Sequence, residues 1–399
     1  MTDHSAPADP KGDLPYLVAG GGIAGLAAAL GLSGLGPAIR LFEQAKAFEE
    51  VGAGLQMSPN GVRALQALGA WEAVEPFCVI PSEIHVRDGV SGRPIQRIRL
   101  GKTFEERFGA PYRVAHRADL LNGLLTTVRQ RPGIALHTGH RIEGVENEGR
   151  GVSLLLGGGG RVDGRAVIAA DGIRSSLREA VAGRVEPIHR GQTIFRALVP
   201  LQSVPPEIEA DCVTLWLCPG GHVVHYPVSN WRSFNIVASA DSTRRIPGWS
   251  EQARTRDVLP FFTTACDDLL NLINAVPNWL AWEGADLPDL PRWSKGNIVL
   301  VGDAAHATLP YLAQGAVMAL EDACVLRHEV KTGGDAPFAR FEEMRRARTA
   351  AIQQQSRGMT RIYHARGPVA LARNLGLRLG GSSALLNRTR WIYDWKLPG

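Results

Sequence analysis

The feature that most constrains the fold lies in residues 16–43, where an apolar run, three spaced glycines, a helical segment and a second apolar run follow one another. The glycines are Gly20, Gly22 and Gly25, and the second run ends on Glu43. This pattern predicts a βαβ unit that binds a dinucleotide. In such a unit the first glycine permits a tight turn, the second lets a pyrophosphate approach the backbone, and the third lets the helix pack against the strand.

Two further properties of this segment narrow the choice of ligand. The predicted helix begins near Ile23 and Ala24, so its N-terminal amides and positive dipole end face the phosphates. Glu43, followed by Gln44, ends the second strand, where its carboxylate can accept hydrogen bonds from both ribose hydroxyls and would repel a 2′-phosphate. FAD or NAD therefore fits this site and NADP does not. A glycine-rich turn without a ligand would explain the glycines, but not the strand, helix and acid around them.

Composition excludes several classes of protein. The chain has 399 residues, of which 45% are hydrophobic and 21% charged, as expected for a soluble globular protein of two or three domains. The net charge of +5 argues weakly for nucleic acid and more for anionic cofactors and carboxylate substrates. Five scattered cysteines without a CxxC spacing predict reduced thiols in a cytoplasmic protein, without a metal site. No apolar run is long enough to span a membrane.

Changes of pattern along the chain predict an α/β fold with a discontinuous domain organisation. Residues 1–15 are polar and predict a disordered lead-in, not a signal peptide. Apolar strands alternating with helices predict a Rossmann-like FAD-binding domain with a parallel sheet, formed by residues 16–79, 106–185 and 291–330. Alternating apolar and polar residues predict a mainly antiparallel β-sheet substrate domain, formed by 80–105 and 186–290, with helices around 251–278. Residues 331–399 predict C-terminal helices whose arginines are solvated and form no site.

Two more strands of the predicted parallel sheet end on acidic residues. Residues 167–170 precede Asp171, with a helix start over 173–178, and an apolar run ending at 301 precedes Gly302 and Asp303. Because α/β sheets bind ligands at the carboxyl ends of their strands, both aspartates are candidate cofactor contacts. An ordinary Asp-Gly turn is the alternative for Asp171.

Four other residues are candidates for contact with the cofactor. Gly54 lies in a glycine-rich loop whose backbone can approach a ligand. Arg117 stands in the first turn of a predicted helix, where the dipole disfavours a cation, so either an anion lies nearby or the arginine is solvated. A further helix is predicted to begin near Gly315 and Ala316, and its N-terminal amides can donate to an electron-rich heterocycle.

His222 and Tyr226 lie four residues apart on one predicted strand of the second sheet, so both side chains point to the same face. The Trp, His and Tyr content of this region suits the wall of a pocket for a flat ring. The same two residues could equally be packed and hydrogen-bonded within the sheet.

Taken together, the three separated signatures resemble those of the FAD-dependent aromatic hydroxylases, the single-component flavoprotein monooxygenases. The signatures are the glycine fingerprint with Glu43, Asp171-Gly172, and Gly302-Asp303. The resemblance covers residues 16–330. The runs EVGAGLQMSPNGVRAL and GDAAHATLPYLAQGA are most similar to the salicylate and 3-hydroxybenzoate hydroxylases.

The resemblance implies a role for each cofactor-binding residue. Glu43 would hold the adenosine ribose and Arg117 would approach the pyrophosphate. Asp171 would contact both FAD and NAD(P)H, and Asp303 would contact the ribityl chain. The loop 310–316 would lie over the isoalloxazine ring, with the amides near Ala316 facing its N1 and C2 carbonyl.

The resemblance also implies the reaction. NADH, or NADPH, would reduce FAD as a transient co-substrate, and O2 would add at C4a to give a hydroperoxide that hydroxylates a small phenolic or heteroaromatic carboxylate. His222 and Tyr226 match positions that line the substrate site in 3-hydroxybenzoate enzymes, and a histidine suits deprotonation of a phenol. Pro310, at the third matching position, replaces a glutamine of some of those enzymes, and Gln56 stands where 6-hydroxynicotinate enzymes have a histidine base. These two differences argue against the exact substrates of those enzymes and leave salicylate-like compounds open as substrates.

Three classes of function therefore compete. The first is the monooxygenase, expected as a monomer or homodimer. The second is a flavin-dependent dehydrogenase or reductase on the same fold that forms no productive hydroperoxide, and the third is a non-catalytic flavoprotein. NADH oxidation that is stimulated by an aromatic acid and consumes oxygen would distinguish the first class from the other two.

Overall fold

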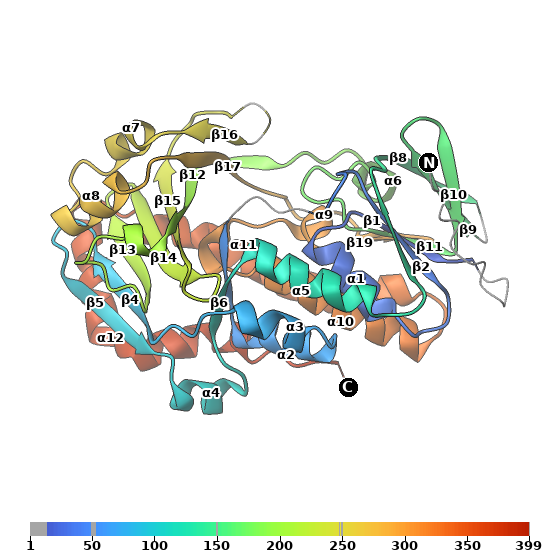
Figure 1. The fold of residues 1–399 in the computed structure, drawn as a ribbon, viewed down its shortest axis with the longest axis horizontal. Helices are drawn as coiled ribbons and strands as arrows, with labels where there is room; N and C mark the ends of the chain where they lie inside the picture. The colour runs from blue at the N-terminus through green and yellow to red at the C-terminus, as the bar shows by residue number, and fades with distance from the viewer. Residues whose placement is uncertain (1–13, 49–52, 149–150, 247, 249, 399) are drawn as a thin grey trace.

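The computed structural model describes residues 14–48, 53–148, 151–246, 248 and 250–398. A six-stranded sheet occupies one end of the elongated molecule, at the right of Figure 1. Five strands run parallel in the order β19-β11-β1-β2-β7, and β18 pairs antiparallel at the edge. The central strands are wholly buried, as in parallel sheets covered on both faces. The strands are β1 (Tyr16–Ala19), β2 (Ile39–Glu43), β7 (Ile134–Thr138), β11 (Ala166–Ala169), β18 (Ser294–Lys295) and β19 (Ile298–Leu300).

Three helices pack together beside this sheet: α1 (Ile23–Leu32), α5 (Arg117–Arg129) and α10 (Gly315–Thr332). A Cβ at Gly31 would lie 2.6 Å from the carbonyl oxygen of Ala323, so glycine is what lets α1 and α10 approach so closely. The shorter α-helices are α2 (Pro59–Ala67), α3 (Trp71–Val74), α4 (Lys102–Phe108), α6 (Arg178–Ala182), α7 (Thr255–Val258), α8 (Asp267–Asn274) and α9 (Asp303–His306). The 3-10 turns are η1 (Glu75–Phe77), η2 (Leu201–Ser203), η3 (Leu259–Phe261) and η4 (Pro310–Leu312).

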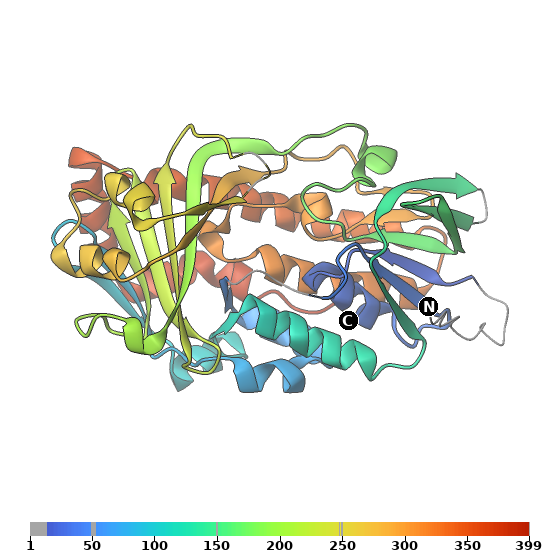
Figure 2. The ribbon, with the colours of Figure 1, turned by 45° about the horizontal axis from the view of Figure 1, so that its top comes forward.

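An eight-stranded sheet forms the opposite end of the molecule (Figures 1 and 2), in the order β16-β17-β12-β15-β14-β13-β4-β5. Every neighbouring pair is antiparallel except β13 and β4. One face packs on an apolar core that includes Trp216, Phe234 and Trp279, and the alternate residues face the interior of the molecule. The strands are β4 (Glu83–Asp88), β5 (Pro94–Arg99), β12 (Ile188–Pro200), β13 (Val213–Cys218), β14 (Gly221–Val228), β15 (Ser233–Asp241), β16 (Ser250–Ala253) and β17 (Trp279–Asp286).

Two small sheets and two long helices complete the fold. The three-stranded sheet contains β8 (Ile142–Glu148), β9 (Gly151–Leu156) and β10 (Gly160–Gly164), and the two-stranded sheet contains β3 (Gly54–Met57) and β6 (Arg113–His116). Helix α11 (Pro337–Tyr363) runs along the molecule from one large sheet toward the other (Figure 2). Helix α12 (Gly367–Tyr393), kinked at Gly381, then packs against β5.

The predicted fold class is confirmed, with two local corrections. The helix expected to start over 173–178 begins only at Arg178, because the Asp171 carboxylate binds the amides of Ser176 and Leu177 and holds the preceding residues in a turn. Of the helices expected around 251–278, the first residues are instead the edge strand β16, which pairs with β17. Residues 1–13 of the predicted lead-in lie outside the described residues. The domain boundaries stay a prediction.

Candidate active site

A cavity of about 540 Å³ lies where the two halves of the molecule meet. Its wall combines the fingerprint turn, β3, the interior face of the large sheet, the loop around η4 and both C-terminal helices. Eleven of the predicted site residues line it: Gly22, Ile23, Ala24, Gly54, Arg117, His222, Tyr226, Asp303, Pro310, Gly315 and Ala316. The other predicted residues, Gly20, Gly25, Glu43, Gln44, Asp171 and Gly302, lie outside the lining.

The three fingerprint glycines have three different physical roles. Gly20 has a φ of +106°, and a Cβ there would lie 2.4 Å from the carbonyl oxygen of Ala170. A Cβ at Gly25 would lie 1.9 Å from the carbonyl oxygen of Gly20, so this glycine brings α1 against the turn. At Gly22 no described atom lies within 4 Å of such a Cβ, and the residue faces the cavity. Gly22 therefore leaves open the space in which a pyrophosphate would approach the backbone.

This difference makes a prediction for two alanine variants. Gly22→Ala is expected to leave the melting temperature of the FAD-free protein unchanged but to weaken FAD binding by about tenfold or more, since the methyl group occupies ligand space. Gly25→Ala is expected to lower stability by about 1–3 kcal/mol, because the backbone must shift. Thermal unfolding of the FAD-free proteins and FAD titration would check both; equal destabilisation of the two apoproteins would contradict the assignment.

The acidic residues at the strand ends are held in position before any ligand binds. Glu43 accepts hydrogen bonds from the amides of Gly21 (2.7 Å) and Ala45 (2.8 Å), whereas Gln44 is exposed. Asp171 uses Oδ2 for the amide of Ser176 at 2.8 Å, while its buried Oδ1 has no hydrogen-bond partner among the described residues. A buried oxygen in that state requires a donor, which a ligand hydroxyl can supply.

Helix α10 points its N-terminus into the cavity through Gly315 and Ala316. Gln314 occupies the N-cap position but turns its side chain into the protein, where its amide nitrogen donates to Ser58 Oγ at 3.0 Å. In the described chain no side chain caps the first turns of α1 or α10. Two helix N-termini thus offer unpaired amides to one cavity, which fits the phosphates and the electron-rich ring of FAD.

A buried charged network supports this end of the cavity. Asp322 accepts hydrogen bonds from the Gly302 amide (2.9 Å), His306 Nε2 (2.7 Å) and Arg345 Nε (2.7 Å). Burial raises the pKa of Asp322, but His306 and Arg345 outweigh it and lower the pKa to about 2. The prediction that the arginines of α11 are solvated is therefore wrong for Arg345, which is 1% exposed.

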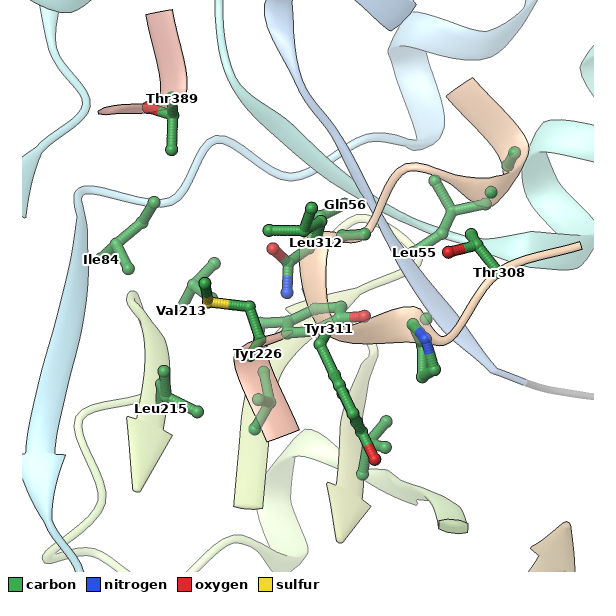
Figure 3. A pocket seen from close by; sticks show the side chains of 18 of the residues that line it. Leu55, Gln56, Ile84, Val213, Leu215, Tyr226, Thr308, Tyr311, Leu312 and Thr389 are labelled. Atoms are coloured by element: carbon green, nitrogen blue, oxygen red, sulfur yellow. The ribbon is translucent and has the colours of Figure 1, made fainter. Parts of the chain in front are cut away.

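Figure 3 shows the part of the cavity between the large sheet and the loop around η4. Tyr226, Tyr311 and Gln56 lie around the same space (Figure 3). Tyr311, on η4 next to Pro310, shares a hydrogen bond with Ser239 Oγ at 2.9 Å, and its ring centroid lies 5.0 Å from that of His222. Apolar side chains close the sheet side: Ile84, Val86, Ile98, Val213, Leu215, Leu217, Val224 and Val237. The arrangement suits a flat ring held between aromatic walls.

Burial sets the protonation states on this wall. His222 is 3% exposed, and burial together with the neighbouring His364 holds its pKa well below the ordinary value. Burial raises the pKa of Tyr226. At neutral pH, His222 is therefore an uncharged imidazole that can accept a proton, and Tyr226 remains a phenol that can donate a hydrogen bond.

The C-terminal helices contain many of the cavity residues that the sequence prediction missed. Ten residues of α11 and α12 line the cavity: Gln355, Met359, Ile362, Tyr363, Leu377, Leu385, Leu386, Arg388, Thr389 and Tyr393. The tail after α12 is tied to the FAD-binding half, since Arg63 of α2 donates to the carbonyl of Trp395 at 2.7 Å. Arg348 of α11 donates to the carbonyl of Trp391, near the end of α12, at 2.9 Å. Residues 331–399, for which the sequence predicted no site, therefore contribute to the wall of the cavity.

Fold and site together define a flavin-binding oxidoreductase. A family model described as FAD binding domain matches residues 13–356. The 3-hydroxybenzoate 6-hydroxylase of Polaromonas naphthalenivorans is 35% identical over 392 residues, which cover 98% of each chain. The chain belongs to the family of FAD-dependent aromatic hydroxylases, the single-component flavoprotein monooxygenases. This confirms the resemblance stated from the sequence.

Two solved structures share the fold over nearly their whole length. Klebsiella pneumoniae HpxO complexed with FAD and uric acid has a TM-score of 0.85 at 25% identity, covering 95% of this chain and 96% of that chain. A salicylate hydroxylase substrate complex has a TM-score of 0.82 at 26% identity, covering 97% and 96%. FAD is therefore the cofactor, with reduced pyridine nucleotide and O2 as co-substrates. Among the described residues, no helix has the length and apolarity needed to cross a bilayer.

Proposed function

We propose that this hydroxylase acts on a small aromatic carboxylate that carries a phenolic hydroxyl group, of the hydroxybenzoate class. The observation that supports the proposal most strongly is the position of His222, an uncharged buried imidazole on the wall of the same cavity into which α1 and α10 open. A phenol becomes a stronger electron donor when it loses its proton, and a neutral histidine can take that proton. The names of the relative and of the salicylate hydroxylase structure point to the same class.

The side chains around the ring would divide the remaining tasks. Bound FAD supplies the redox chemistry by which O2 is activated, and the fingerprint turn, Glu43, Arg117, Asp171, Asp303 and the amides near Ala316 would hold it. Tyr226 and Tyr311 would orient the ring, and the apolar sheet face would exclude water. Pro310 lines the wall but has no side-chain donor or acceptor, so we propose that it shapes the pocket and leaves proton transfer to His222.

We further propose that the enzyme works in the cytoplasm as a monomer or homodimer. The support for a reducing compartment is the state of its five cysteines, all within the described ranges: each is a free thiol and four are buried. Size-exclusion chromatography with light scattering would distinguish the two assembly states.

The test of the proposed function is a substrate panel. The FAD-loaded protein is mixed with NADH or NADPH, O2 and each of a set of hydroxybenzoates, aminohydroxybenzoates and hydroxypyridine carboxylates. We expect a hydroxybenzoate to stimulate NADH oxidation with one hydroxylated product per NADH consumed. NADH oxidation that does not depend on an aromatic compound and yields only hydrogen peroxide would favour the reductase alternative. Hydroxylation of a hydroxypyridine carboxylate instead of a hydroxybenzoate would change the proposed substrate class to heteroaromatic carboxylates.

A further inference from the structure

His222 does not stand alone on the cavity wall. Its Nδ1 lies 2.9 Å from Nε2 of His364, a residue of the turn between α11 and α12 that is 5% exposed. His364 Nδ1 in turn lies 2.6 Å from Oδ1 of Asp241, at the end of β15. The Asp241 side chain is 40% exposed. Three side chains from three elements therefore form a continuous hydrogen-bonded row from the buried cavity to the solvent.

The carboxylate fixes the direction of the row. An ionised Asp241 can only accept, so His364 donates its Nδ1 proton to it and keeps the lone pair on Nε2. His222 then donates its own Nδ1 proton to that lone pair, which leaves the basic lone pair of His222 on Nε2. A carboxylate that sets a histidine tautomer in this way also stabilises the imidazolium that forms when the ring takes up a proton.

We propose that Asp241, His364 and His222 form a proton relay that carries the substrate's phenolic proton from the closed cavity to water. The proposal rests on the proposed function for the origin of that proton. The phenol O–H bond breaks and a proton joins His222 Nε2, while the Nδ1 proton of His222 passes to His364 Nε2. The Nδ1 proton of His364 passes to Asp241 and from there to water. The substrate remains as the phenolate, and the relay ends with one proton released.

The surroundings of the row favour transfer in this direction. Burial raises the pKa of Asp241, but hydrogen bonds from His364 and Arg366 outweigh burial and lower that pKa overall. The carboxyl group of Asp241 therefore gives up its proton readily. The other titratable groups packed on the two histidines are Tyr311 and Tyr363, whose pKa values burial raises to about 12. Both tyrosines stay neutral at working pH, and the hydroxyl of Tyr311 is hydrogen-bonded to Ser239 Oγ at 2.9 Å, away from the row.

Holding the helix turn in place does not require the His364 ring. The carbonyl of His364 accepts from the Gly220 amide at 3.0 Å, and Arg373 donates to the carbonyls of Ile362 and Tyr363 at 3.0 Å each. These backbone contacts remain when the ring is changed. His364→Gln therefore tests proton transfer separately from the hydrogen bonds, because a side-chain amide can accept from His222 and donate to Asp241 but cannot pass a proton on. Arg373→Gln is the matched control, since it loosens the same turn without touching the relay.

The experiment follows a proton directly and needs neither NADH nor O2. Oxidised FAD-loaded enzyme is mixed in a stopped-flow instrument with a hydroxynitrobenzoate, whose absorbance changes when its phenol ionises, at a pH below the pKa of the free probe. We expect the wild-type protein and Arg373→Gln to ionise the bound probe quickly. His364→Gln is expected to bind it with a similar Kd but to ionise it about tenfold more slowly or worse. Asp241→Asn, which changes only the solvent end, is expected to slow ionisation as well.

The relay would be overturned by ionisation in His364→Gln at the wild-type rate, or by an equal loss in Arg373→Gln, which would show that the turn only supports the wall. A probe that stays protonated in the wild-type protein would overturn it too. The substrate panel judges the proposed function separately, because product formation is not measured in this experiment.

Discussion

Replacing His222 by asparagine is expected to lower the rate of aromatic hydroxylation by about 10²- to 10⁴-fold, the range in which a positioned acid or base contributes. The side-chain amide of asparagine can reproduce the contact of His222 Nδ1 with His364, at 2.9 Å in this structure, but has no atom in place of the basic Nε2. The variant should therefore fold, bind FAD and be reduced by NADH. Single-turnover hydroxylation, followed by product analysis, measures the loss.

The strand itself offers a matched control for this variant. His225 is also buried, lies three residues along β14 and therefore faces the opposite side of the sheet, where it accepts a hydrogen bond from Trp216 Nε1 at 2.9 Å. His225→Asn is expected to lose stability but to retain hydroxylation. An equal loss of hydroxylation in both variants would show that the histidines support the sheet and that His222 is not the base.

The pH dependence of the wild-type rate follows from the same residue. Because burial and His364 hold the pKa of His222 well below its ordinary value of about 6.5, the imidazole is already the free base at neutral pH. Hydroxylation should not rise further as the pH increases from about 6.5, and should fall only when acid protonates the ring in the cavity. A rate that still climbs with an apparent pKa near 7 would mean that another group limits proton removal.

The parts of this protein that the sequence predicted well depend on local patterns. The fingerprint glycines, the apolar strands before Asp171 and Gly302, and the helix start at Gly315 are each readable from a few neighbouring residues. The structure places the fingerprint turn, Asp171 and Gly302 at the ends of adjacent strands, and it places Gly315 on the wall of the cavity. His222 and Tyr226 could be paired on one face because the period of a strand is two.

The parts that could not be predicted depend on contacts between distant segments. His364 and Asp241 are 123 residues apart and carry no motif, so only the packing of the α11–α12 turn on β15 makes them partners. Arg345 lies in an arginine-rich stretch that resembles a solvated helix face, yet its buried position is set by two acids on α10 that are more than twenty residues away. Charge patterns along one helix cannot show which of its cations will meet a buried acid.

Replacing Arg345 by methionine is expected to destabilise the protein by about 3–5 kcal/mol, because it removes one cation from a buried network of charges. Asp322 then keeps only His306 and Glu321 keeps only Arg348 among these ion pairs. Arg345 is 1% exposed and donates to Asp322 Oδ1 and Glu321 Oε2 at 2.7 Å each. The same acids hold the Gly302 amide and Asn60 in place beneath the cofactor site, so FAD affinity should fall with stability. Denaturant unfolding of the FAD-free protein and FAD titration measure the two effects.

The control for this prediction lies on the same helix. Arg340 forms an ion pair of 2.6 Å with Glu329, but its side chain is 38% exposed, so Arg340→Met should cost no more than about 1 kcal/mol of stability.

Unfolding by acid should also differ between the Arg345→Met protein and the wild-type protein. The pKa of Asp322 is lowered to about 2 in the folded protein, whereas an aspartate in the unfolded chain has a pKa of about 3.9. The ionised Asp322 therefore stabilises the fold fully above about pH 3.9, and this stabilisation is lost as the pH falls toward 2. Without Arg345 that pKa rises, so Arg345→Met should unfold at a higher pH than the wild-type protein. Equal stability and equal acid midpoints for the two variants would contradict a buried ionised network under the flavin site.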